Sequence, residues 1–121
     1  GYWDNVWLKV PFCAVYWGNR PTIDSQLTST FGGGLKNPWN DTHFQNAEVD
    51  KLLEGARVEL DQAKRGQMYA KAQELISQNS GMVCFAIQDY LDAHSTKLQG
   101  LTVSARYDLG DQRLAEKGWF A

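Results

Sequence analysis

The sequence contains little of what several classes of functional site require. It has two cysteines and two histidines, and neither His43 nor His94 stands at a metal-ligand spacing from a cysteine. The glycines at 32–34 are not followed by the lysine and hydroxyl of a phosphate-binding loop. Ser95 adjoins His94, but neighbours on a strand point to opposite faces, so this pair is poorly placed for proton transfer. We therefore expect a protein that is not an enzyme and that uses no metal or other cofactor.

An excess of one charge sign and long apolar runs are also lacking. Twelve basic against fourteen acidic residues leave a net charge of -2, which gives no electrostatic footprint for nucleic acid or an anionic membrane. The longest apolar runs, FCAVYW (12–17) and MVCFAI (82–87), have six residues each, far fewer than the roughly 20 that a membrane helix needs. The opening GYWDNVWLKV shows no signal-peptide pattern. Since 43% of the residues are hydrophobic and 21% charged, one globular domain is expected.

The two apolar runs that are present predict an α/β fold. Residues 12–17 and 82–87 are rich in aromatic and β-branched side chains, which favours buried strands. Helical spacing lies between them, so we expect the two strands to share one sheet covered by helices. Cys13 and Cys84 lie inside these runs, which favours two small buried thiols; a disulfide between neighbouring strands is the open alternative.

The spacing of apolar residues predicts helices at four places, namely 3–9, 23–31, 49–60 and 64–78. Asn46 and Asp61 are suited to capping the two longer helices, and Gly81 to the left-handed conformation that ends the second. Further on we expect a short strand ending at Gly100, a possible strand in LTVSA (101–105) and a polar helix in GDQRLAEKGWF (110–120).

Three stretches carry a family resemblance, in this order: YWGNRPTID (16–24), WND (39–41) and the long segment from VDKLLEG to TKLQG (49–100). Together they resemble the C-terminal part of family 5 extracellular solute-binding proteins, the dipeptide-, oligopeptide- and nickel-binding components of ABC importers. The resemblance implies a partial lobe of a type II periplasmic-binding-protein fold, with a small mixed sheet packed by helices. Residues 1–100 would belong to the second, C-terminal lobe, and residues 101–121 would form a tail that returns towards the first lobe. Intact members are several times longer, so we expect a fragment.

The resemblance also implies a function and a set of ligand-binding residues. The protein would be bacterial, periplasmic or extracellular, and would deliver a small solute, peptide-like or otherwise polar, to the permease subunits of an ABC transporter without itself spanning the membrane. The ligand-binding residues would be Tyr16, Trp17, Asn19 and Arg20. Tyr16 and Trp17 would supply flat apolar surface, Asn19 hydrogen bonds and Arg20 a bidentate grip on a carboxylate.

Other interpretations of the same residues remain open. Arg20 and Asp24 are one helical turn apart and suited to pairing with each other, and Tyr16 alternates with Phe12 in a way that suits a core position. No acidic residue occurs from Phe12 to Thr22 to hold the α-amino group of a peptide, which weakens the case for free peptides and favours sugars, opines or other small polar molecules. Nickel is supported by no histidine or cysteine cluster. The alternative function is a stand-alone protein-interaction module of α/β fold with no transport role.

Overall fold

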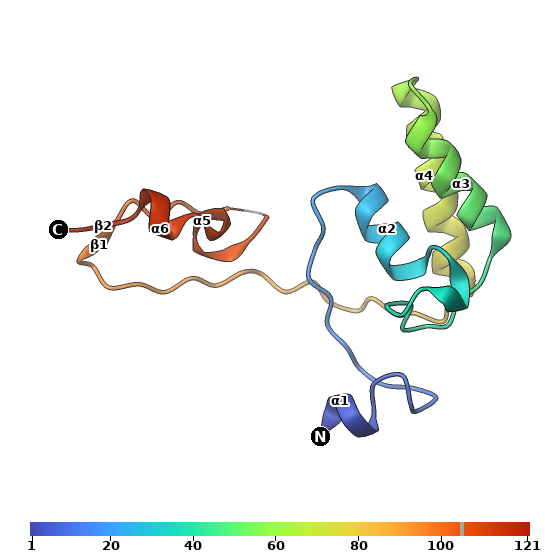
Figure 1. The fold of residues 1–121 in the computed structure, drawn as a ribbon, viewed down its shortest axis with the longest axis horizontal. Helices are drawn as coiled ribbons and strands as arrows, with labels where there is room; N and C mark the ends of the chain where they lie inside the picture. Colours follow the sequence, from blue (N-terminus) through green and yellow to red (C-terminus); the bar gives the residue numbers. More distant parts are fainter. Residues whose placement is uncertain (105) are drawn as a thin grey trace. The chain divides into compact units, whose positions relative to one another are not determined.

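The computed structural model is mostly helical and describes residues 1–104 and 106–121 (Figure 1). The chain divides into two units, Gly1–Val83 and Cys84–Ala121. In the first unit the elements are α1 (Tyr2–Asn5), α2 (Ile23–Phe31), the 3-10 helix η1 (Gly34–Lys36), α3 (Ala47–Val58) and α4 (Gln62–Asn79). The second unit contains β1 (Leu98–Gln99), α5 (Asp108–Gln112), α6 (Leu114–Lys117) and β2 (Trp119–Phe120).

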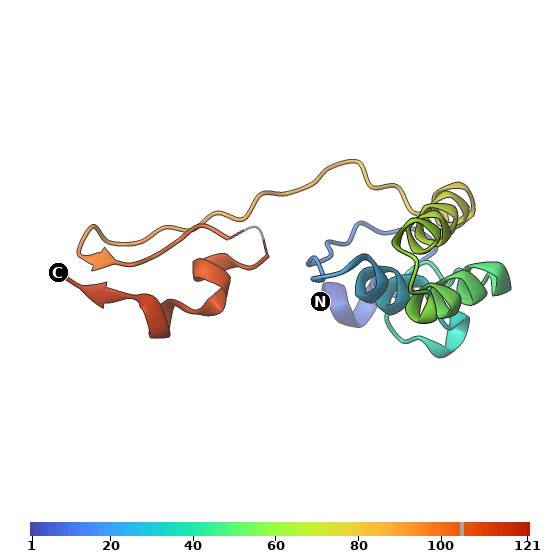
Figure 2. The same cartoon turned by 90° about the horizontal axis from the view of Figure 1, so that it is seen from above.

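The centre of the first unit is a helical hairpin of α3 and α4, which lie side by side in Figures 1 and 2. Asn46 caps α3, accepting hydrogen bonds from the backbone N–H groups of Glu48 and Val49 at 2.9 and 3.2 Å. Asp61 caps α4 in the same way, and Gly81 follows the helix with a φ of 74°. The predicted helices, their caps and the left-handed glycine are therefore confirmed, because local spacing and capping chemistry determine them.

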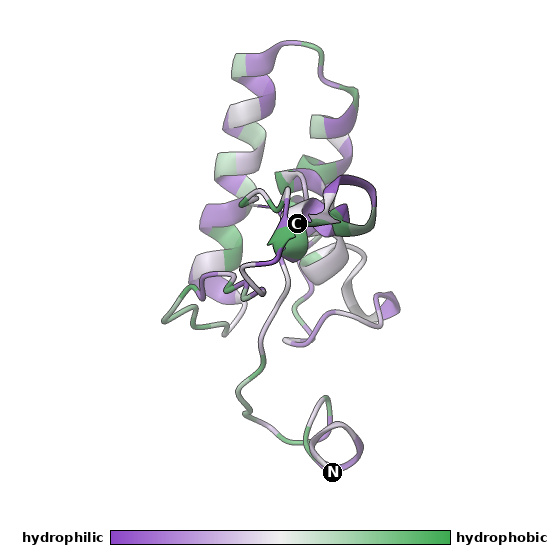
Figure 3. Ribbon diagram, turned by 90° about the vertical axis from the view of Figure 1, so that its left-hand side faces the viewer, coloured by the Kyte–Doolittle hydropathy of each residue, from purple (hydrophilic) through white to green (hydrophobic). Residues whose placement is uncertain are grey.

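The core of the first unit is made almost entirely of helix faces. Its members are Leu27, Phe31, Phe44, Val49, Leu53, Ala56, Tyr69, Ala72 and Ile76. Hydrophilic and hydrophobic residues alternate along the helices, as Figure 3 shows, so each helix has an apolar face to bury and a polar face for water. The helix expected over 23–31 matches α2 and supplies two of these core residues, Leu27 and Phe31.

The prediction of an α/β fold is wrong. Residues 12–17 and 82–87 are extended but form no ladder, and most of their side chains are exposed; Phe12 is 85% exposed and Ile87 is 92% exposed. In the described part of the chain the one sheet joins β1 and β2, two residues each. A high β-propensity favours a strand only where the segment can pack against a neighbouring strand. In the first unit the helices bury their apolar faces against one another, so these two segments are left without such a neighbour. The mixed sheet of a periplasmic-binding-protein lobe is therefore absent from these residues.

The second unit contains a small antiparallel pairing in which Leu98 faces Phe120 and Gln99 faces Trp119. The expected short strand is thus present and ends just before Gly100, whose φ is 84°. Residues 101–104 form no strand, against expectation, and Ala105 lies outside the described residues. The terminal helix expected over 110–120 is reduced to α6, because the residues from Leu109 to Gln112 take left-handed conformations that cannot continue a right-handed helix.

The helix expected over 3–9 is also shorter than its apolar spacing suggests. It ends at Asn5, and Leu8 takes a φ of 57°. Among the described residues, no helix is both long enough and apolar enough to cross a membrane.

Candidate ligand-binding site

Tyr16, one of the predicted ligand-binding residues, lies on the wall of an aromatic hollow. The hollow has a volume of about 330 Å³ and is lined by Tyr2, Trp3, Ala14, Val15 and Tyr16. Small-molecule sites commonly have volumes of about 300–1,000 Å³ and mostly apolar walls. The side chain of Tyr16 is 80% exposed, so the interpretation that Tyr16 faces the core is wrong. The hollow is the candidate site of this chain.

Two short segments, α1 and the extended residues 14–16, are held together to form the hollow. The hydroxyl of Tyr2 donates a hydrogen bond to the carbonyl oxygen of Ala14 at 2.5 Å. The rings of Tyr2 and Trp3 have centroids 5.1 Å apart and stand at 88° to each other, an edge-to-face arrangement that aromatic pairs favour. The hollow therefore has two aromatic surfaces at a right angle, with the exposed ring of Tyr16 beside them.

Trp17 lies next to the hollow and is held in place by Asp41. Its indole Nε1–H donates to one carboxylate oxygen of Asp41 at 2.7 Å, and the indole of Trp7 donates to the other oxygen at 2.8 Å. Trp7 in turn packs at 6.1 Å from the ring of Trp39. The carboxylate of Asp41 thus links the WND loop to Trp7, which follows α1, and to Trp17, which follows residues 14–16. The sequence gives little sign of this role, because Asp41 is recognisable only as a loop residue.

Asn19 and Arg20 do not contribute to the hollow. They are absent from its lining, and the guanidinium of Arg20 lies 3.4 Å from the carbonyl oxygens of Gly18 and Asn19. The alternative in which Arg20 pairs with Asp24 is also wrong, because Asp24 is bound by Arg57 of α3 at 3.1 Å. The structure therefore brings Tyr16 to the hollow, places Trp17 beside it and leaves Asn19 and Arg20 outside it.

The side chains that line the hollow are uncharged, and charged groups lie near it in the sequence. Hydrogen bonding with the side chain of Cys13 is the main cause that raises the pKa of Tyr2, followed by burial. The carboxylate of Asp4 pairs with the N-terminal ammonium of Gly1 at 3.2 Å. The ammonium of Lys9 donates to the backbone carbonyl of Asp4. Nearby charges are thus paired with one another or hydrogen-bonded within the chain.

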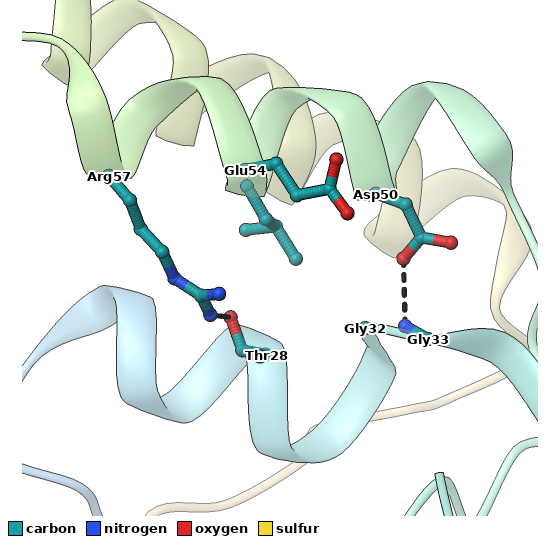
Figure 4. A pocket seen from close by; sticks show the side chains of 7 residues that line it. Thr28, Gly32, Gly33, Asp50, Glu54 and Arg57 are labelled. Carbon is teal, nitrogen blue, oxygen red and sulfur yellow. Dashed lines mark hydrogen bonds between the residues drawn. The ribbon is translucent and has the colours of Figure 1, made fainter. Parts of the chain in front are cut away.

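A second pocket lies between the C-terminal end of α2 and one face of α3 (Figure 4). It has a volume of about 120 Å³ and is lined by Thr28, Gly32, Gly33, Asp50, Leu53, Glu54 and Arg57. Arg57 donates to the hydroxyl of Thr28 at 2.6 Å, and Asp50 accepts from the backbone N–H of Gly33 at 2.8 Å. These contacts hold α3 against α2. We interpret this pocket as part of the packing between the helices, because Thr28, Asp50 and Arg57 already have partners within the chain.

The histidines and cysteines form no common site in the described residues. No group of three histidine, cysteine, aspartate or glutamate side chains there is arranged to hold a metal ion. Both cysteines are free, Cys13 half-buried and Cys84 exposed, so the prediction of a buried thiol at Cys84 is wrong. Its exposure follows from the unpaired state of residues 82–87.

Comparison of the chain with models of protein families, with curated proteins and with solved structures finds no match.

Proposed function

We propose that this chain is a ligand-binding part of a solute-binding protein of an ABC importer, which captures a small solute and delivers it to membrane permease subunits. The observation that supports solute binding is the position of Tyr16. This residue, selected from the sequence as a ligand contact, is exposed on the wall of an aromatic hollow large enough for a small molecule. The link to an importer rests on the resemblance of the sequence.

The hollow is suited to binding because its walls are set before a ligand arrives. The bond from Tyr2 to Ala14 fixes one wall, and the bond from Trp17 to Asp41 fixes the chain immediately after Tyr16. Pre-organised walls reduce the entropy lost on binding. The side chains that line the hollow offer aromatic and aliphatic surface and no acid–base pair, so its chemistry is recognition.

The affinity of this hollow for a solute should be low. Trp3 is 54% exposed and Tyr16 is 80% exposed, so a bound molecule keeps one side in water. Each hydrogen bond then contributes a net of about 1 kcal/mol, whereas association costs several kcal/mol before any contact counts. We expect dissociation constants in the millimolar range, which corresponds to roughly 4 kcal/mol.

A titration followed by NMR tests the proposal on the 121-residue chain. The probes are the dipeptide glycyl-phenylalanine and the neutral compound N-acetylphenylalaninamide. We expect saturable shifts of the signals of Trp3 and Tyr16 with at least one probe. Tyr16→Ala should abolish them, whereas Phe12→Ala, which removes another exposed ring outside the hollow, should not. Shifts that stay linear up to the solubility limit of both probes would reject solute binding at this hollow.

A second candidate function is protein interaction, which the exposed apolar side chains of the second unit favour. Phe85, Ile87 and Leu91 are 87%, 92% and 89% exposed, and an extended backbone of this kind can pair with a strand of another protein. Hydrogen exchange at rising protein concentration tests this. Protection confined to the amides of residues 84–91 would support association through this segment. Unchanged exchange at these amides would reject association between copies of this chain through the segment.

A further inference from the structure

We infer that the aromatic hollow binds a solute through a quaternary ammonium group, which it prefers to an uncharged group of the same shape. The inference rests on the proposed function and specifies the class of solute. Three observations carry it: three aromatic rings line one hollow, the other two lining residues are aliphatic, and no lining residue carries a charge.

The aromatic rings of the hollow belong to Tyr2, Trp3 and Tyr16. The rings of Tyr2 and Trp3 stand at 88° to each other with centroids 5.1 Å apart, so that their faces enclose a corner. The face of an aromatic ring is the negative side of its quadrupole, and a cation within about 6 Å of the ring centroid is attracted to it. A cation in this corner can contact two ring faces, and the exposed ring of Tyr16 lies on the wall of the same hollow.

The remainder of the lining favours an alkylated ammonium over a primary one. Ala14 and Val15 are aliphatic, and the lining contains no carboxylate. A primary ammonium has three N–H donors and is strongly hydrated, so it would lose water in the hollow without a carboxylate to accept its hydrogen bonds. A quaternary ammonium has no N–H donor, and its outer surface consists of methyl groups that pack against apolar walls. The lining therefore suits a cation that needs no hydrogen-bond acceptor.

The size of the hollow also suits such a group. A cavity of about 150 Å³ holds benzene in another protein, and a trimethylammonium group is similar to benzene in size. The volume of the hollow is about 330 Å³, which leaves room for the chain that carries the ammonium. Trp3 is 54% exposed, so the remainder of the solute can extend into water.

Charged side chains near the hollow lie outside its lining and have both signs. Hydrogen bonding with Cys13 is the largest cause that raises the pKa of Tyr2, and the negative charge of Asp41 is a smaller one, so this carboxylate acts on one wall. Lys9 and Arg20 bring positive charge, and both donate to backbone carbonyls. Because these charges oppose one another, we attribute the preference for a cation to the ring faces.

Choline and its carbon analogue, in which a tert-butyl group replaces the trimethylammonium group, test the inference because they have the same shape. Ethanolamine, which is charged at neutral pH, is the primary ammonium counterpart. From the NMR shifts of Trp3 and Tyr16 in the 121-residue chain we expect choline to bind with a dissociation constant in the millimolar range. The other two probes should bind at least about fivefold more weakly, which corresponds to roughly 1 kcal/mol for a cation at partly exposed rings.

Two leucine variants separate the ring faces from apolar contact in general. Tyr16→Leu keeps an apolar side chain and removes a ring, so choline should bind at least about twofold more weakly while the carbon analogue keeps its wild-type affinity. Phe12→Leu removes an exposed ring that does not line the hollow and should leave the affinity for both probes unchanged. The preference for choline should persist in about 0.5 M NaCl, because salt screens distant exposed charges and not a cation in contact with a ring.

The outcomes distinguish the inference from the proposed function. Equal or tighter binding of the carbon analogue or of ethanolamine would overturn the inference and leave solute capture intact. A preference that disappears in salt, or that Tyr16→Leu leaves unchanged, would also overturn it, because the preference would then come from surrounding charges or from another site. Failure of choline to saturate, with saturation by N-acetylphenylalaninamide, would overturn the inference alone. Failure of choline, N-acetylphenylalaninamide and glycyl-phenylalanine together would remove the proposed function as well.

Discussion

The carboxylate of Asp24 on α2 lies 3.1 Å, through both of its oxygens, from the Nε of Arg57 on α3. Arg57 also donates from Nη2 to the hydroxyl of Thr28 at 2.6 Å. One guanidinium therefore binds two side chains one turn apart on α2 and fixes how this helix lies on α3. The sequence suggests different partners for Arg57, because Glu54 and Asp61 stand at helical pair spacings from it.

Asp24→Asn should lower the free energy of unfolding of the first unit by about 1 kcal/mol or less. The effect is small because the Arg57 side chain is 46% exposed and solvent screens the pair. Urea denaturation followed by helical circular dichroism measures it, and a double-mutant cycle with Arg57→Ala isolates the pair. Glu74→Gln removes half of the more exposed pair between Lys71 and Glu74 and serves as control. A loss in the control as large as that in Asp24→Asn would contradict a specific role for Asp24.

The stability of the first unit should fall at alkaline pH through Tyr69. Burial is the main cause that raises the pKa of Tyr69, and the charge of Asp24 adds to it. The pKa of Tyr69 in the folded protein lies above the unfolded value of about 10. The contribution of its neutral phenol to the free energy of unfolding is therefore fully present below pH 10 and is lost as pH rises through the folded pKa. Between pH 8 and 11.5 the free energy of unfolding, measured by denaturation, should fall more steeply with pH for the wild type than for Tyr69→Phe. Tyr16→Phe, which alters an exposed ring, should follow the wild type; identical curves for all three proteins would reject the role of Tyr69.

Two glycines in the helical hairpin should respond differently to alanine. A Cβ at Gly66 in α4 meets no atom within 4 Å, whereas one at Gly55 in α3 would lie 2.5 Å from the terminal methyl of Met68. Gly66→Ala should therefore stabilise the first unit by about 0.5–1 kcal/mol through helix propensity. Gly55→Ala should gain little or lose stability, because Met68 packs against the core and must move. Thermal and urea denaturation compare the two variants, and equal gains would show that Met68 moves aside without a measurable loss of stability.

The helices α2, α3 and α4 could be predicted from the sequence because their determinants are local. Val49, Leu53 and Ala56 follow one face of a helix, and Asn46 provides the cap directly before it. Capping and amphipathic spacing act within one or two turns. Such features can be recognised without knowledge of what the helix packs against.

The sheet could not be predicted reliably because strand pairing is not local. Phe85 and Ile87 have the β-propensity of a strand, yet their segment pairs with no other strand among the described residues. The same limit applies to the candidate site. The exposure of Tyr16 could not be read from the sequence, which also suited a core position. The link between Trp17 and Asp41 joins residues 24 positions apart and depends on the folded loop.

The bridge that Asp41 forms between Trp7 and Trp17 leads to the last prediction. Asp41→Ala should free both indole N–H groups, each now bonded to the carboxylate at 2.7–2.8 Å. Both indoles are half-buried, so the loss of each hydrogen bond should cost about 1 kcal/mol of net free energy. A difference of this size corresponds to roughly fivefold faster exchange of the indole protons with solvent. Glu74→Ala removes an exposed carboxylate of α4 that pairs with Lys71 and is the matched control.

The same variant should also affect the hollow, because Trp17 directly follows Tyr16 and anchors the end of that wall. In Asp41→Ala, N-acetylphenylalaninamide should bind more weakly than in the wild type, while Glu74→Ala should retain wild-type binding. Indole exchange is read from solvent-exchange NMR of the two tryptophan side chains, and binding from the same titration. Unchanged exchange at both indoles would show that Asp41 does not hold them in solution. Faster exchange with unchanged binding would show that the wall at Tyr16 keeps its shape without this carboxylate.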